Sequence, residues 1–311
     1  MTNNSYTQLI FSIHLKILTT ILLLSQSKSE KFQPYNLNGG LISAIAGKNY
    51  ILIASDTRFS NGSYDILSRQ HLQSRLYKVS SSNEDFGDLL DDCSSINIPN
   101  AAFLPKEVRM NVYDGVFIGS SGCASDSEAL KRHIITEIQS ITSGSQIVSA
   151  NCISNVLGQI LYSRRSFPFY SFCITAGFDG TGVVHVYDAI GSNERVAVGA
   201  VGNGKELLQP ILDRLFSTTS QSKTNIAKDG NKIEAEDQVK ALDLLPPVKT
   251  YVDCEDVEEA IGLLLCGYRS VAEREISVGD DVVVCIVRND GDCGDGCNGT
   301  LEVRRFPLKK H

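Results

Sequence analysis

The chain has 311 residues, a length that suggests about two domains and still allows one large domain. Hydrophobic residues make up 42% and charged residues 21%, which are ordinary globular values and exclude a disordered or collagen-like polymer. The formal net charge of −7 argues against a protein that binds nucleic acid mainly through its phosphates, because such binding needs a basic surface.

The amino-terminal segment imitates a secretory signal peptide. A short apolar stretch from Ile17 to Leu24 follows basic residues, and it is too short to span a bilayer. The sequons Asn61-Gly62-Ser63 and Asn298-Gly299-Thr300 are compatible with secretion. Scattered cysteines and the lack of a small-residue cleavage site argue against it. We interpret residues 1–35 as a leader and residues 36–311 as one domain.

The first predicted elements of this domain are strands. Residues 41–46 and 50–55 are apolar runs joined by turn residues, which predicts a buried hairpin. A third apolar run at 115–122 leads into residues 126–140, where apolar positions recur at helical spacing. Strands therefore precede a helix.

The rest of the chain repeats this pairing of like elements. A predicted helix at 147–163 is followed by two predicted strands at 169–177 and 182–188, with turn residues between them. Later predicted elements are helices at 206–216 and 255–274 and a closing strand at 281–287 before a polar tail. Adjacent pairs of strands and of helices favour antiparallel sheets covered by helices over a parallel βαβ alternation.

Two polar segments do not join this pattern. They cover residues 80–105 and 217–250 and are rich in Ser, Asn, Asp, Thr and Lys. We interpret both as surface insertions of the tolerated kind, with a partner-binding arm as the alternative.

The nine cysteines give little sign of a metal site. Four lie in apolar surroundings and are predicted to act as small core hydrophobes: Cys152, Cys173, Cys266 and Cys285. Cys293 and Cys297 are spaced one residue wider than the commonest zinc knuckle, and no second pair lies near them. We expect a surface turn there, and neither a metal nor a cofactor.

A glycine-rich segment matches part of a phosphate-binding loop. The segment from Gly199 to Lys205 fits G-x-x-x-x-G-K, but Glu206 stands where Ser or Thr should hold magnesium. A carboxylate there would repel phosphates, so nucleotide binding is only a remote alternative. The preferred interpretation is a strand-to-helix turn in which Gly202 and Gly204 allow close backbone passage.

Several motifs, taken in order, resemble the β-type subunits of the proteasome. The resemblance covers residues 32–304, and its motifs lie at 38–47, 54–58, 118–122, 160–165 and 208–213. The Leu-Tyr-Ser-Arg-Arg sequence with the following aromatic-proline run is similar to the non-catalytic sixth member of the eukaryotic β ring. The resemblance implies an α+β fold, a four-layer αββα sandwich of two antiparallel sheets, as in amino-terminal-nucleophile hydrolases.

The same resemblance implies that the nucleophile is missing. In active members, removal of a leader after a glycine exposes a threonine, whose hydroxyl attacks the peptide carbonyl while its free amine acts as the base. Here Gly40 follows Gly39, and glycine has no side-chain oxygen. An active hydrolase of this fold, the alternative function, would need another terminal nucleophile, and Ser25 to Ser29 lie too far upstream.

Other positions of the family's active site depart as well. The family's acidic residue is retained at position 56. We interpret Asp56 as a structural carboxylate that caps backbone N–H groups or pairs with Arg58. The remaining departures replace a lysine, a serine, an aspartate and a second serine by Arg75, Asn203, Glu275 and Val278. An arginine stays fully protonated and is a poor substitute for a lysine that tunes an amine.

The implied role is a non-catalytic structural subunit. It would build the β ring and the proteolytic chamber of a 28-subunit core with other α and β subunits, for ubiquitin-dependent protein degradation in cytoplasm and nucleus. Substrate polypeptides would pass through the chamber, and neither nucleic acid nor membrane would be a partner. Residues near 120–127 are expected at the rim of a neighbour's substrate pocket.

Overall fold

The structure is a computed structural model that describes residues 35–62, 65–69, 75–80, 106–142, 147–221, 250–291 and 298–308, together with Lys16. Contacts divide the chain into two units, Met1–Tyr35 and Asn36–His311. Most of the leader, most of both predicted insertions, and Cys293 and Cys297 lie outside the described residues. The predictions about these parts therefore remain predictions.

One sheet of the second unit contains six described strands. Their order is β11 (Val198–Gly202), β1 (Leu41–Ala46), β2 (Tyr50–Asp56), β12 (Asp281–Asn289), β13 (Gly299–Pro307) and β6 (Lys106–Met110). Neighbours pair antiparallel, with Ala44 opposite Ile53 and Ile53 opposite Cys285. Every residue of β1 and β2 is buried, which explains why both are unbroken apolar runs and not alternating ones.

A second antiparallel sheet contains five described strands. Their order is β10 (Asn193–Val196), β9 (Thr181–Tyr187), β8 (Ser171–Asp179), β7 (Val116–Gly122) and β5 (Leu76–Val79). A separate two-stranded ribbon joins β3 (Phe59–Asn61) to β4 (Asp65–Ser68). The predicted hairpin at 169–188 is confirmed, and its turn contains Gly180 at a φ of +75°.

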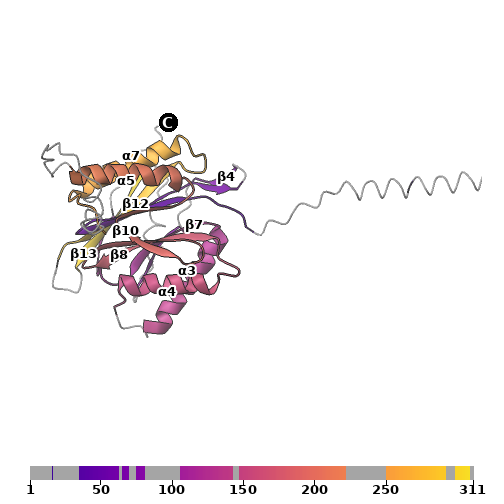
Figure 1. The fold of residues 1–311 in the computed structure, drawn as a ribbon, viewed down its shortest axis with the longest axis horizontal. Coiled ribbons are helices and arrows are strands. Elements are labelled where there is room, and N and C mark those ends of the chain that lie inside the picture. Colours follow the sequence, from indigo (N-terminus) through magenta and orange to yellow (C-terminus); the bar gives the residue numbers. More distant parts are fainter. Residues whose placement is uncertain are drawn as a thin grey trace, which may run out of the picture. The chain divides into compact units, whose positions relative to one another are not determined.

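Helices cover the outer face of each sheet (Figure 1). They are α3 (Ala124–Thr142), α4 (Ala150–Ser163), α5 (Lys205–Gln221) and α7 (Val257–Ala272). The side chain of Ser149 caps α4, and that of Asp256 caps α7, by accepting a hydrogen bond from a backbone N–H of the first turn. The predicted αββα sandwich is confirmed.

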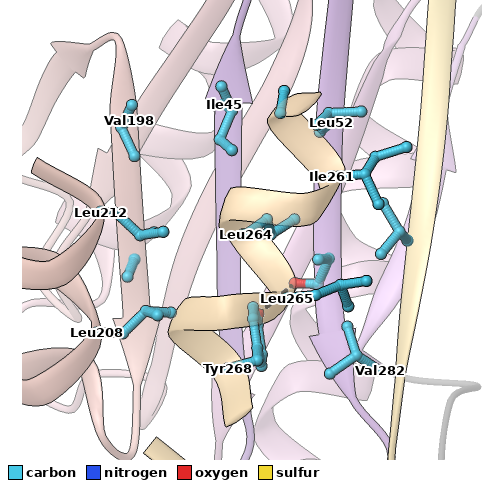
Figure 2. Packing of buried hydrophobic residues seen from close by; sticks show 14 of the residues in the cluster. Ile45, Leu52, Val198, Leu208, Leu212, Ile261, Leu264, Leu265, Tyr268 and Val282 are labelled. Carbon is cyan, nitrogen blue, oxygen red and sulfur yellow. Dashed lines mark hydrogen bonds between the residues drawn. The ribbon is translucent and has the colours of Figure 1, made fainter. Parts of the chain in front are cut away.

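Three hydrophobic clusters hold these layers together. Figure 2 shows α7 lying over β1 and β2, with Leu264 and Tyr268 directed toward the sheet and Leu208 of α5 beside them. A second cluster lies between the sheets and includes Ile53 of β2 and Ile174 of β8. The third lies between the five-stranded sheet and the helices α3 and α4. Burying each such side chain contributes about 1.5–3 kcal/mol.

The carboxyl-terminal part corrects one prediction. The strand at 281–287 does not close the fold before a polar tail, because β13 follows it and pairs with both β12 and β6. Sequence reasoning missed β13 because its buried residues include a carboxylate, Glu302, that lies between Arg288 and Arg304. A charged strand lacks the apolar run on which the prediction depended.

Two smaller predictions are also corrected. The helix α5 extends to Gln221, beyond the expected start of the second insertion at Ser217. Cys173 and Cys285 are buried as predicted, Cys152 is half-buried, and Cys266 is exposed on α7 and is no core residue.

Candidate functional site

The positions singled out in the sequence meet at the start of β1. Gly40 directly precedes this strand, is buried, and has a φ of +101°. Its carbonyl oxygen accepts a hydrogen bond of 3.0 Å from the backbone N–H of Asn203. On its other side lies Arg75, whose guanidinium occupies the space that a Gly40 side chain would need. The structure therefore brings Gly40, Arg75 and Asn203 together.

Asp56 and Arg75 form a buried ion pair below Gly40. A guanidinium nitrogen of Arg75 lies 2.7 Å from Asp56 Oδ1, and side-chain exposure is 0% for Asp56 and 4% for Arg75. Asp56 also accepts hydrogen bonds from the backbone N–H groups of Leu41, at 2.9 Å, and Gly279, at 3.4 Å. The interpretation of Asp56 as a carboxylate that caps backbone N–H groups is confirmed.

The alternative interpretation, a pair between Asp56 and Arg58, gives way to other partners, because Asp56 pairs with Arg75. Arg58 instead forms two hydrogen bonds with the carboxylate of Asp280, at 2.8 and 3.1 Å. It also donates to the carbonyl of Ile276 at 2.7 Å. The sequence could not indicate Asp280 as the partner of Arg58, because the two residues are 222 positions apart and are brought together by the turn before β12.

Arg75 also binds backbone carbonyls. Its guanidinium donates to the carbonyl oxygens of Asp56 at 3.0 Å and Asn38 at 3.2 Å, and to that of Arg58. Burial lowers the pKa of Arg75 from its ordinary value, and the carboxylate of Asp56 opposes this shift. Burial raises the pKa of Asp56, which Arg75 and the backbone N–H of Leu41 oppose. This pair holds three chain segments together.

Asn203 and Glu275 meet through a residue that sequence reasoning missed. The amide of Asn203 donates to the hydroxyl of Ser277 at 3.1 Å, and that hydroxyl donates to Glu275 Oε1 at 2.7 Å. Val278 is fully buried in the cluster beneath α7 and takes no part in this chain of hydrogen bonds. Only the position of Ser277 between Glu275 and Val278 could have drawn attention to it.

The rim expected near residues 120–127 concerns a neighbouring subunit and remains a prediction; in this chain the segment contains both buried and exposed residues. The hydroxyls of Ser120 and Ser127 are buried and lie near Cys173 and Ser171, respectively. Gly122, in contrast, lines a pocket of about 360 Å³. The other lining residues are Leu37, Tyr170, Phe172, Gly202, Asn203, Gly204, Lys205, Glu206 and Glu275.

The glycine-rich segment forms the predicted strand-to-helix turn. Gly199 and Gly202 belong to β11, and Lys205 begins α5. A β-carbon on Gly202 would lie 2.0 Å from the carbonyl oxygen of Gly40, so this position requires glycine. Because β11 runs antiparallel to β1, the surrounding sheet is unlike the parallel sheet of a nucleotide-binding fold.

The described residues contain neither a metal-binding cluster nor a membrane-spanning helix. No group of three or more His, Cys, Asp or Glu side chains there is placed to hold a metal ion. No helix in the described part of the chain is long and apolar enough to cross a membrane.

Comparison with known proteins identifies the family. A family model described as "Proteasome subunit" matches residues 108–230. The chain is 31% identical over 286 residues to proteasome subunit beta type-1 of Drosophila melanogaster, covering 91% of this chain and 92% of the relative. It is 30% identical over 267 residues to the Arabidopsis thaliana beta type-1 subunit, covering 84% of this chain and 92% of the relative. A probable proteasome subunit beta type-6 of Schizosaccharomyces pombe is 28% identical over 290 residues, covering 92% of this chain and 100% of the relative. With this similarity along nearly its whole length, the chain belongs to the proteasome β-subunit family.

Proposed function

We propose that this chain is a non-catalytic structural subunit of the proteasome core. It builds a β ring and walls the chamber in which neighbouring subunits cleave polypeptides. The observation that carries the proposal is Gly40, which stands where active members have a threonine and offers no hydroxyl for attack on a peptide bond.

The surroundings of Gly40 support an inactive site. In this chemistry the base is the free amine of the nucleophilic residue itself. Arg75, the cation beside Gly40, binds Asp56 and three carbonyl oxygens. The hydroxyl of Ser277 lies near Gly39, but it already donates a hydrogen bond to the carboxylate of Glu275. These contacts support a structural role, and not a catalytic one, for the residues around Gly40.

The partners proposed are other proteasome subunits. Relatives along most of the chain are named proteasome beta subunits, and side-by-side heterologous contacts close a ring when the rotation fits. We further propose the 28-subunit core of two β rings between two α rings, located in cytoplasm and nucleus. The net charge of −7 fits protein partners better than nucleic acid.

Purification of the native particle tests this function. The chain should co-migrate with other α and β subunits at several hundred kilodaltons. A peptide electrophile that acylates terminal threonines should label neighbouring subunits and leave this chain at its unmodified mass. Terminal sequencing of the same sample shows whether the leader is cut and where. A lone monomer, or a chain that carries the acyl label, contradicts the proposal.

A further inference from the structure

The turn after α4 exposes a serine that directly follows two arginines. Residues 162–167 are all exposed, and the N–H of Phe167 donates to the carbonyl of Arg164 at 2.9 Å. This hydrogen bond closes a β-turn whose two central residues are Arg165 and Ser166. Within the described residues, the Ser166 hydroxyl forms no hydrogen bond. Ser166 therefore lies at the tip of a turn with its hydroxyl open to solvent.

A second serine lies on the other side of the two arginines and is bound differently. The hydroxyl of Ser163, the last residue of α4, donates to the carbonyl of Ile160 at 2.7 Å. Ser163 also precedes the arginines in the chain, whereas Ser166 follows them. Kinases distinguish substrate serines by the pattern of charges around them, so these two serines are not equivalent acceptors.

The guanidinium groups of both arginines rest on aromatic rings. That of Arg164 lies 5.3 Å from the ring centroid of Phe169, and that of Arg165 lies 4.6 Å from the ring centroid of Tyr162. Arg165 also donates to the carbonyl of Tyr162 at 3.3 Å. Stacking on an exposed ring is weak, so either guanidinium can leave its ring for a stronger partner.

Neither arginine has an anionic partner among the residues that the structure describes. Asp126, a carboxylate of α3 that contacts this segment, instead accepts from the backbone N–H of Tyr170 at 2.8 Å. One turn therefore presents two guanidinium groups and an unbonded hydroxyl without an anion. A phosphate on that hydroxyl would bind the guanidinium groups through charge-assisted hydrogen bonds.

We propose that Ser166 is a phosphorylation site of an arginine-directed serine kinase, and that Arg164 and Arg165 first recruit the kinase and then bind the phosphate. The kinase transfers the γ-phosphoryl group of ATP to Ser166 Oγ. The new O–P bond forms, the bond from phosphorus to the β–γ bridging oxygen breaks, ADP leaves, and the hydroxyl proton passes to the catalytic base of the kinase. Phe167, which is 71% exposed, offers the kinase an apolar contact directly after the serine.

The modification changes the charge of this turn. A phosphoserine carries a charge of about −1.5 to −2 at pH 7, which offsets the two guanidinium charges. The arginines also shield the phosphate from the carboxyl end of α4, where the helix dipole disfavours an anion. Phosphorylation therefore converts a cationic turn into a nearly neutral one and weakens its attraction for acidic segments of other chains.

Kinase treatment of the purified full-length chain tests the acceptor. With ATP and the catalytic subunit of cAMP-dependent protein kinase, phosphopeptide mapping should place the phosphate on Ser166 and not on Ser163. Ser166→Ala should abolish incorporation into this peptide. The double variant Arg164→Ala, Arg165→Ala should slow incorporation about ten-fold or more, because charge-assisted contacts with the kinase are lost. Arg132→Ala, which removes an exposed arginine of α3, is the matched control and should leave the rate unchanged.

Phosphorus NMR of the phosphorylated chain tests whether the arginines bind the phosphate. In a pH titration, the second pKa of the phosphoserine should lie below its ordinary value of about 6, because the guanidinium groups favour the doubly charged form. In the double arginine variant, phosphorylated to completion by longer treatment, this pKa should return to its ordinary value. A purely structural role of the arginines would not move it.

Three results would overturn the proposal. The first is phosphorylation at Ser163, or at Ser166 with equal rates in the wild type and the double arginine variant. The second is an ordinary second pKa of the phosphoserine in the wild-type chain. The third concerns the native chain purified with phosphatase inhibitors, which should contain the phosphopeptide of Ser166 and would contradict the assignment if it did not.

Discussion

The guanidinium carbon of Arg75 lies 2.8 Å from the place that a β-carbon on Gly40 would occupy. Arg75 cannot move aside cheaply, because it is buried and holds Asp56 and three carbonyl oxygens. The backbone of Gly40 adds a second constraint, since a φ of +101° is strained for any residue with a side chain. The glycine at 40 and the arginine at 75 are therefore sterically coupled.

Gly40→Thr should not restore cleavage, and it should destabilise the subunit. Backbone strain and the clash with Arg75 together cost about 2–5 kcal/mol. Thermal denaturation and the rate of peptide hydrolysis by purified particles measure the two effects. Gly180→Ala is the matched control, because Gly180 also has a positive φ but no atom within 4 Å of its added β-carbon. A stable, active Gly40→Thr particle would refute the coupling.

Arg75→Met should be among the most destabilising single substitutions of a charged residue in this chain. It leaves the carboxylate of Asp56 buried without its partner, which costs about 3–5 kcal/mol. The control is Arg69→Met, which removes an exposed guanidinium from Asp280 while Asp280 keeps its two hydrogen bonds from Arg58, and it should cost about 1 kcal/mol or less. Chemical denaturation measures the loss in the free energy of unfolding of the two variants. Equal losses would show that the buried pair stabilises the fold no more than the Arg69 contact does.

Tyr268→Phe should weaken the contact between α7 and the start of the six-stranded sheet. The Tyr268 hydroxyl lies 3.2 Å from the carbonyl oxygen of Leu41 and 3.0 Å from that of Ala54, and it accepts from Ser43 at 3.1 Å. Its loss leaves buried polar groups without a partner, and we expect a cost of about 1–3 kcal/mol. Tyr162→Phe on an exposed side chain should change the melting temperature little, and an equal shift would contradict the assignment.

Stability should depend on pH through Glu302. Burial raises the pKa of Glu302, but hydrogen bonds from Arg304 and Arg288 outweigh burial and hold it below the ordinary 4.5. Because the folded pKa is depressed, this stabilisation is present above about pH 4.5 and is lost as the pH falls through the folded value. Glu302→Gln should therefore be less stable than wild type near neutral pH, with the difference shrinking in acid. Denaturation midpoints at a series of pH values measure it, and a constant difference would exclude this origin.

The amino-acid sequence by itself determined the layered fold and the absence of a side-chain hydroxyl at position 40. Apolar runs such as β1 and β2, and helical spacing in α3 and α7, reflect burial that each segment needs regardless of its partner. Gly40 needs no structure to be recognised as lacking a hydroxyl. Local chemistry of this kind is present in every residue before the chain folds.

Only the tertiary structure decided which polar groups meet. Sequence reasoning offered Arg58 as one of two alternatives for Asp56, missed the charged strand β13, and gave Asn38 no role beyond a motif. Each outcome depends on residues far apart in the chain: Arg58 with Asp280, Glu302 with Arg288, and Asn38 with Ala124. Buried polar groups must find partners, but their residue types do not specify which of several distant partners the fold delivers.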